Sequence, residues 1–152
     1  MKKFKLASIL MTAGLFLTIG AQANAAGIGY IDYQKVQSNF PFAQQAIKEI
    51  DSKALEMQQY MVDKEKQYKA LDTPLKKQNF EEQTAREFKL KEEAYMKLKA
   101  QKEEQVYNKI QAATKEVLVE QKLDAVVDYR VIFVGGVDIS DIVIQKLKSG
   151  KF

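Results

Sequence analysis

One stretch of the sequence limits the fold more than any other. Residues 42–121 contain no glycine and a single proline, and Lys, Glu, Gln, Ala and Leu, which all favour helices, dominate them. The stretch carries 15 basic and 15 acidic residues. A balanced, polar sequence of this length predicts long helices that bury one narrow face and keep the rest in water.

The apolar residues of this stretch recur with two different periods. In the first half only Lys64 interrupts a spacing of three or four residues, which is typical of a heptad seam: Ile47, Ile50, Ala54, Met57, Met61, Tyr68 and Leu71. In the second half Tyr95, Val106 and Val117 recur every 11 residues, which predicts a nearly straight or slightly right-handed helix. Each helix is therefore expected to pack against one partner.

The sequence Asp72-Thr73-Pro74 interrupts the helical pattern, because a residue before proline is pushed out of the helical region. Asn79 and Glu82 resemble a capping box at a new helix start. We therefore predict an antiparallel helical hairpin over residues 42–121, with a turn near residues 72–79 and a second helix from about Phe80 to Gln121. Two alternatives remain: Pro74 begins the second helix, or it kinks one continuous helix.

Residues 1–25 have the three parts of a secretory signal peptide: an n-region with three lysines, an apolar run over residues 6–19, and small residues at 21, 23 and 25. We predict cleavage after Ala25, or after Ala23, and export to the periplasm or beyond. An uncleaved anchor is the alternative, but a membrane span needs about 20 apolar residues. Cleavage leaves 21 basic and 20 acidic residues, a net charge of +1 that predicts no nucleic-acid partner.

The two chain ends, residues 26–41 and 122–152, are predicted to meet and form a small body. Residues 28–32, 124–128 and 131–134 read as strands, the last two as a hairpin, and residues 34–40 and 140–148 as short helices. A body of 47 residues with open strand edges is marginal alone. We therefore expect a homo-oligomer with a shared sheet or barrel. Its candidate oligomerisation residues are Ile28, Tyr30, Val126, Val127, Ile132 and Val134.

The composition excludes several kinds of chemistry. The chain has no His and no Cys, so it has no thiol nucleophile, imidazole base, Cys/His zinc site or disulfide. Its glycine pairs lack the spacing of a nucleotide-binding loop. The aspartates of the two chain ends are explained as caps and turn residues. We predict no catalytic residue, no metal and no cofactor, and therefore a protein that is not an enzyme.

The two chain ends also carry a family resemblance. Ile28-Gly29-Tyr30-Ile31-Asp32 with Lys35-Val36, the segment 123–128, and Gly135-Gly136-Val137-Asp138-Ile139-Ser140 resemble the Skp/OmpH family of periplasmic chaperones for outer-membrane proteins. The resemblance implies an α+β, mostly α fold: a homotrimer with a small β-barrel body and one helical hairpin tentacle per chain around a cavity. It also implies an ATP-independent holdase for unfolded outer-membrane proteins.

Within the hairpin, large apolar side chains off the seam or near the tip are candidates for client contact, because exposed apolar groups often mark interaction sites. These candidates are Tyr60, Phe80, Phe88, Tyr95 and Met96. The net charge of +1 argues against strong electrostatic capture of lipopolysaccharide and leaves a weak membrane or lipopolysaccharide contact open. The alternative function is an exported coiled-coil adaptor or scaffold that docks onto a folded envelope partner.

Overall fold

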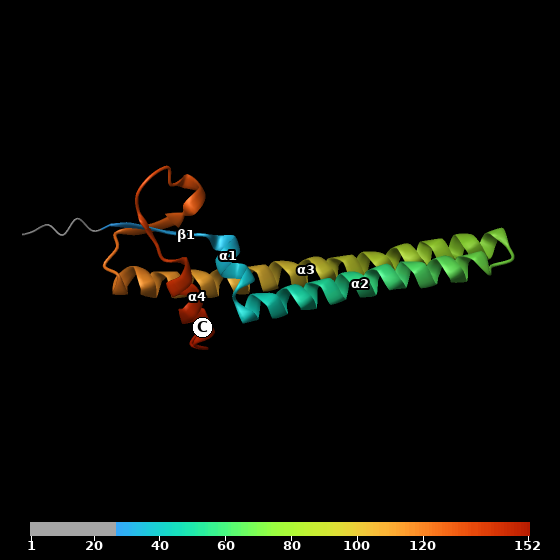
Figure 1. Cartoon of the computed structure of the whole chain (residues 1–152). Helices are drawn as coiled ribbons and strands as arrows, with labels where there is room; N and C mark the ends of the chain where they lie inside the picture. Colours follow the sequence, from blue (N-terminus) through green and yellow to red (C-terminus); the bar gives the residue numbers. More distant parts are fainter. Residues whose placement is uncertain (1–26) are drawn as a thin grey trace, which may run out of the picture.

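The structure is a computed structural model that describes residues 27–152, so the predicted signal peptide and its cleavage sites lie outside the described residues. A long pair of helices projects from a small body, and the C-terminus lies at that body (Figure 1). The fold is mostly α with one small sheet, which confirms the predicted class. Its elements are β1 (Ile28–Ile31), α1 (Tyr33–Ser38), α2 (Pro41–Lys69), α3 (Pro74–Glu120), β2 (Ala125–Asp128), the 3₁₀ turn η1 (Tyr129–Val131), β3 (Val137–Asp138) and α4 (Ser140–Lys148).

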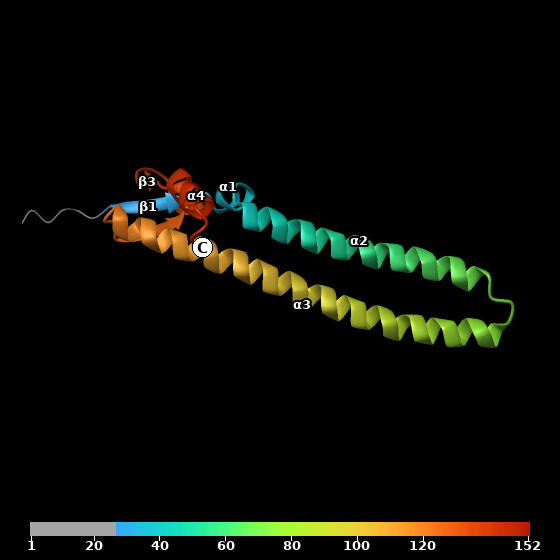
Figure 2. The same ribbon diagram turned by 90° about the horizontal axis from the view of Figure 1, so that it is seen from below.

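Helices α2 and α3 form the hairpin and lie side by side in both views (Figures 1 and 2). The chain reverses over residues 70–73, and Pro74 occupies the first turn of α3. Thr73 is extended, with φ −120° and ψ 148°, as the residue before a proline must be. Its side chain accepts a hydrogen bond from the Lys76 N–H. The predicted start near Phe80 with an Asn79 cap is therefore wrong, and the alternative that Pro74 begins the helix is confirmed.

The sheet has three parallel strands in the order β2-β1-β3. Tyr30 of the central strand pairs with Val127 on one side and with Asp138 on the other. The first two strands lie within one residue of their predicted bounds. Both outer strands leave one edge open, so one chain does not close a barrel.

The predicted strand over residues 131–134, and with it the hairpin to residues 124–128, is wrong. The Asp128 carboxylate accepts hydrogen bonds from the backbone N–H and the guanidinium of Arg130, and these bonds hold the 3₁₀ turn that follows β2. Gly135 and Gly136, both at φ +86°, then let the chain reverse. The third strand is consequently the two residues Val137–Asp138, and it runs parallel to β1.

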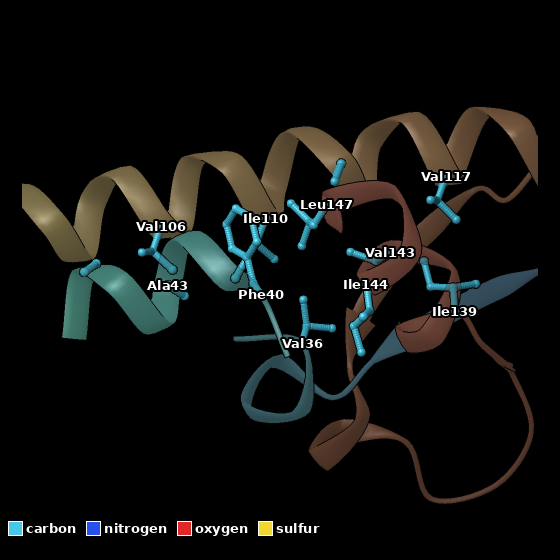
Figure 3. Packing of buried hydrophobic residues seen from close by; sticks show 12 residues of the cluster. Val36, Phe40, Ala43, Val106, Ile110, Val117, Ile139, Val143, Ile144 and Leu147 are labelled. Carbon is cyan, nitrogen blue, oxygen red and sulfur yellow. The ribbon is translucent and has the colours of Figure 1, made fainter. Parts of the chain in front are cut away.

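The hydrophobic core lies entirely at the body end of the molecule (Figure 3). It joins α1, the first turns of α2, the last turns of α3, and α4 through Val36, Phe40, Ala43, Ala46, Val106, Ile110, Ala113, Val117, Ile139, Val143, Ile144 and Leu147. Between residues 47 and 105 no described residue is buried. The hairpin therefore begins in a packed core and continues as a pair of helices with a half-exposed seam.

Polar contacts fasten the chain ends to this core. The buried Ser140 hydroxyl accepts a hydrogen bond from the Asp32 N–H at 2.9 Å and donates one to Asp138 at 2.6 Å, which ties β1 and β3 to the start of α4. Lys146 of α4 forms ion pairs with Glu116 and Glu120 of α3. Residues far apart in the sequence are thus fixed at the base of the hairpin.

Candidate functional site

The seam between α2 and α3 keeps part of the predicted set, including Tyr68, and adds Tyr60 and Lys64, which the prediction left out of it. Tyr60, Lys64 and Tyr68 are half-buried towards α3, whereas Met61 is 44% exposed. The assignment of Met61 to the seam is therefore wrong. The lysine that appears to interrupt the seam in the sequence is part of it.

A polar cluster crosses the seam in the outer part of the hairpin. Glu87 of α3 accepts hydrogen bonds from the Tyr60 hydroxyl at 2.6 Å and the Gln83 amide at 2.7 Å, and it pairs with Lys64 at 2.9 Å. The hydrogen bond from Lys64, supported by the other two, lowers the pKa of Glu87 from 4.5 to about 2. Burial, followed by the hydrogen bond to Glu87, raises the pKa of Tyr60. Tyr60 is thus engaged inside the hairpin.

The Lys64 ammonium group also contacts two aromatic rings of the hairpin. It lies 5.2 Å from the ring centroids of both Tyr60 and Phe80, a distance at which cation–π attraction operates. Phe80 in turn packs against Tyr68, with ring centroids 6.4 Å apart. Aromatic rings and one shared cation therefore hold the outer part of the hairpin together in place of an aliphatic core.

Two adjoining hollows form an apolar groove on the hairpin. The distal hollow has a volume of about 400 Å³ and is lined by Met61, Lys64, Glu65, Tyr68, Phe80, Glu81, Thr84, Ala85 and Phe88. The proximal hollow has a volume of about 470 Å³ and is lined by Met57, Gln58, Met61, Val62, Glu65 and Phe88. Met61, Glu65 and Phe88 are common to both, so we call their combined lining the hairpin groove. Each hollow falls within the size range of small ligand sites.

The groove includes some of the predicted client-contact residues and not others. Phe80 and Phe88 line it. Tyr60 is held in the seam by Glu87, Tyr95 is half-buried on α3 outside the groove, and Met96 is 56% exposed outside it. The structure thus brings together two of the five.

Sequence reasoning missed the wall of the groove that α2 supplies. Met57, Met61 and Val62 line it, although a heptad reading gives the two methionines to the seam. One signal was present in the sequence: adjacent apolar residues such as Met61 and Val62 cannot both point at one partner helix, because neighbours on a helix face different directions.

The body carries a third hollow, of about 520 Å³, between α3, β1 and β2. Its apolar lining includes Val126 and Val127, which are predicted oligomerisation residues, together with Ile31, Tyr33 and Tyr107. Ile28 is half exposed, while Tyr30 and Ile132 are partly buried.

The loop after η1 exposes apolar side chains. Val131 is 72%, Phe133 102% and Val134 87% exposed in the single chain. Three large apolar side chains within four residues are unusual on a surface with no partner.

Residues 27–152 hold no cluster of three or more carboxylates placed to bind a metal ion. In the same residues no helix combines the length and the apolar character that crossing a bilayer requires.

Comparison with known families identifies the chain. A family model described as outer membrane protein (OmpH-like) matches residues 27–147, which is the body and the hairpin together. The chain belongs to the OmpH-like family. A candidate outer membrane chaperone (OmpH-like) from Caulobacter crescentus CB15, known from a crystal structure, is 14% identical, with 82% of this chain and 85% of that chain covered and a TM-score of 0.38. A comparison with curated protein sequences gives no match.

Proposed function

We propose that this OmpH-like protein is an ATP-independent periplasmic holdase that binds unfolded outer-membrane proteins and prevents their aggregation. The observation that carries the proposal is the hairpin groove, an apolar surface that lies outside the core in a family named for outer-membrane proteins. The hairpin is anchored in the body core, and beyond that core it leaves Met61 44% and Leu55 64% exposed. Such a surface suits many weak contacts with an unfolded chain.

Self-association completes the proposal. A homotrimer whose bodies share a barrel would cover the open edges of β2 and β3 and the exposed loop around Phe133, each of which is unsatisfied in one chain. Three hairpins around one client would also multiply weak contacts, because linked binding sites act at a high effective concentration. The periplasmic location rests on the signal-peptide pattern of residues 1–25.

The test uses the mature protein and a urea-unfolded outer-membrane β-barrel protein. The client is diluted into buffer with and without the mature chain, turbidity is followed, and the soluble complex is weighed by light scattering after gel filtration. We expect suppressed aggregation and a mass of three chains plus one client. A Phe88→Ala variant should protect less well than Leu90→Ala, which removes an exposed apolar side chain outside the groove.

Three results would contradict parts of the proposal. Unchanged aggregation in the presence of a folded, soluble chain would reject the holdase activity. Binding to one folded envelope protein, with no affinity for unfolded chains, would favour the adaptor. A monomeric mass at micromolar concentration would reject the trimer.

A further inference from the structure

The two hollows of the hairpin groove lie in series along α2. The first residue of α2 that lines the proximal hollow is Met57. The first that lines the distal hollow is Met61, four residues later. Four residues of α-helix rise about 6 Å. In an extended chain, residues i and i+2 are about 6.6 Å apart, and their side chains point to the same side. The hollows are thus offset by nearly the repeat of an extended segment.

The wall between the hollows is built from Met61 and Phe88, which are common to both. Methionine is flexible and polarizable, so it can adjust to side chains of different shape on either side. Each hollow accordingly offers its own apolar contact surface. Together they suit two separate apolar side chains better than one continuous bulky group.

Some of the charged side chains that line the distal hollow form ion pairs and one does not. Lys64 is paired with Glu87, and Glu65 is paired with Lys69. Glu81 also lines this hollow: it accepts a hydrogen bond from the Tyr68 hydroxyl, which raises the pKa of Tyr68, but within residues 27–152 its negative charge has no ion-pair partner. The rim therefore presents one carboxylate that a basic side chain on an occupant would complement.

We propose that the hairpin groove binds extended segments whose large apolar side chains occupy alternate positions, i and i+2, with a Lys or Arg beside them. The first side chain enters one hollow, the second enters the other, and the residue between them points to water. The basic residue pairs with Glu81. This deepens the proposed holdase function and rests on it: it names the local pattern that the hairpin reads in an unfolded client.

Strands of outer-membrane barrels have this pattern, because lipid-facing apolar residues alternate with lumen-facing polar ones. A helical occupant would present side chains at i and i+4, which are also about 6 Å apart. Its i+3 side chain would share the groove-facing side and lie against the charged rim, whereas an extended segment turns its single intervening residue away from the groove. The extended segment therefore fits the groove better than the helix does.

The test uses the mature full-length hairpin protein and three short fluorescent peptides of one composition. Each peptide carries two Phe residues in a Ser, Thr and Lys background, placed at i and i+1, at i and i+2, or at i and i+4. Fluorescence anisotropy gives the dissociation constants. We expect the i, i+2 peptide to bind at least about fivefold more tightly than the other two, since a well-filled apolar pocket is worth more than about 1 kcal/mol.

Four variants check where the peptide binds. Phe88→Ala removes the shared wall, and Ala85→Phe fills the distal hollow without removing any packing, so each should abolish the preference for i, i+2. Leu90→Ala, outside the groove, should retain it. Glu81→Gln should weaken the Lys-containing peptide by about twofold to threefold, as expected for an exposed ion pair, and leave a Lys-free version unchanged.

Equal affinity for the three peptides would overturn the inference, and so would tightest binding of the i, i+4 peptide. A preference for i, i+2 that survives Ala85→Phe would also overturn it, because the peptide would then bind elsewhere. Turbidity assays with the same preparations separate this failure from a failure of the holdase. Suppressed client aggregation without a spacing preference rejects only the groove, whereas loss of both rejects the holdase.

Discussion

The lining of the hairpin groove contains a hydroxyl whose removal should stabilise the protein. The Thr84 Oγ1 atom is buried and has no hydrogen-bond partner within residues 27–152. An unpaired buried polar group costs about 1–3 kcal/mol. Valine keeps the β-branched shape and has nearly the same helix propensity as threonine. Because the Thr84 side chain is only half-buried, we expect Thr84→Val to raise the free energy of unfolding by about 1 kcal/mol, at the low end of that range.

A matched control lies on the same helix. The Thr114 hydroxyl donates a hydrogen bond to the Ile110 carbonyl at 2.8 Å, so Thr114→Val makes the same chemical change but removes a satisfied group. We expect it to lower the free energy of unfolding by about 0.5–1 kcal/mol. Urea unfolding followed by circular dichroism, at one fixed protein concentration, measures both changes. Shifts of the same sign in the two variants would refute the argument that the hydrogen-bond partner decides the effect.

The remaining predictions concern the polar cluster, the core and the loop before β3. The depressed pKa of Glu87 contributes stability that is present above pH 4.5 and is lost as the pH falls towards about 2. Glu87→Gln should therefore flatten the decline of the urea midpoint over that interval. An unchanged pH profile would show that the ionised Glu87 side chain does not stabilise the hairpin. Ile110→Ala should cost about 2–5 kcal/mol in the same unfolding assay, whereas Leu90→Ala, 68% exposed, should cost less than about 0.5 kcal/mol; similar losses would contradict the location of the core. Gly135→Ala would cause only backbone strain, because both glycines have a positive φ. In Gly136→Ala the added methyl group would also lie 3.2 Å from the Ile28 carbonyl oxygen. We therefore expect Gly136→Ala to lower the melting temperature more than Gly135→Ala does. Equal melting temperatures would indicate that this contact relaxes without cost.

Much of the architecture could be predicted because it depends on local chemistry. A stretch without glycine and with one proline leaves few alternatives to long helices. Pro74 has to lie in a turn, at a kink or in a first helical turn, and Thr73 has to be extended before it. The capping box at Asn79 misled the prediction, because a helix that has already begun at Pro74 needs no second cap.

The strand over residues 131–134 could not be predicted correctly for the opposite reason. Its residues are β-branched and apolar, but whether they form a strand depends on a partner edge. In one chain Arg130 is bound back to Asp128 by its backbone and its guanidinium, and β1 pairs with Val137–Asp138 instead. Strand propensity reports how well a residue fits a pleated surface, and it cannot say which surface is available.

The groove could not be predicted from the heptad pattern. That pattern places the apolar residues on one face of the helix and implies that they fill the contact with the partner helix. The seam here takes in Lys64 and Tyr60, whose long side chains reach Glu87 across the gap between the helices. Ionic and aromatic contacts that bridge this gap leave Met61 beside the seam and turned towards solvent. Polar residues that occupy seam positions therefore displace apolar ones towards the surface, which is how this hairpin obtains an apolar groove.

This arrangement separates the residues that stabilise the chain from those that would contact a client. Within residues 27–152 every buried apolar side chain lies at the body end, from Val36 to Leu147 in sequence but within one cluster in space. Beyond it the helices are held by half-buried aromatic and ionic contacts, which are individually weak and open more easily than a packed core. Because the core lies elsewhere, we expect a groove on such a hairpin to adjust its width to different side chains without unfolding the body. Substitutions in the groove should therefore change client binding with little loss of global stability, whereas substitutions around Ile110 should do the reverse.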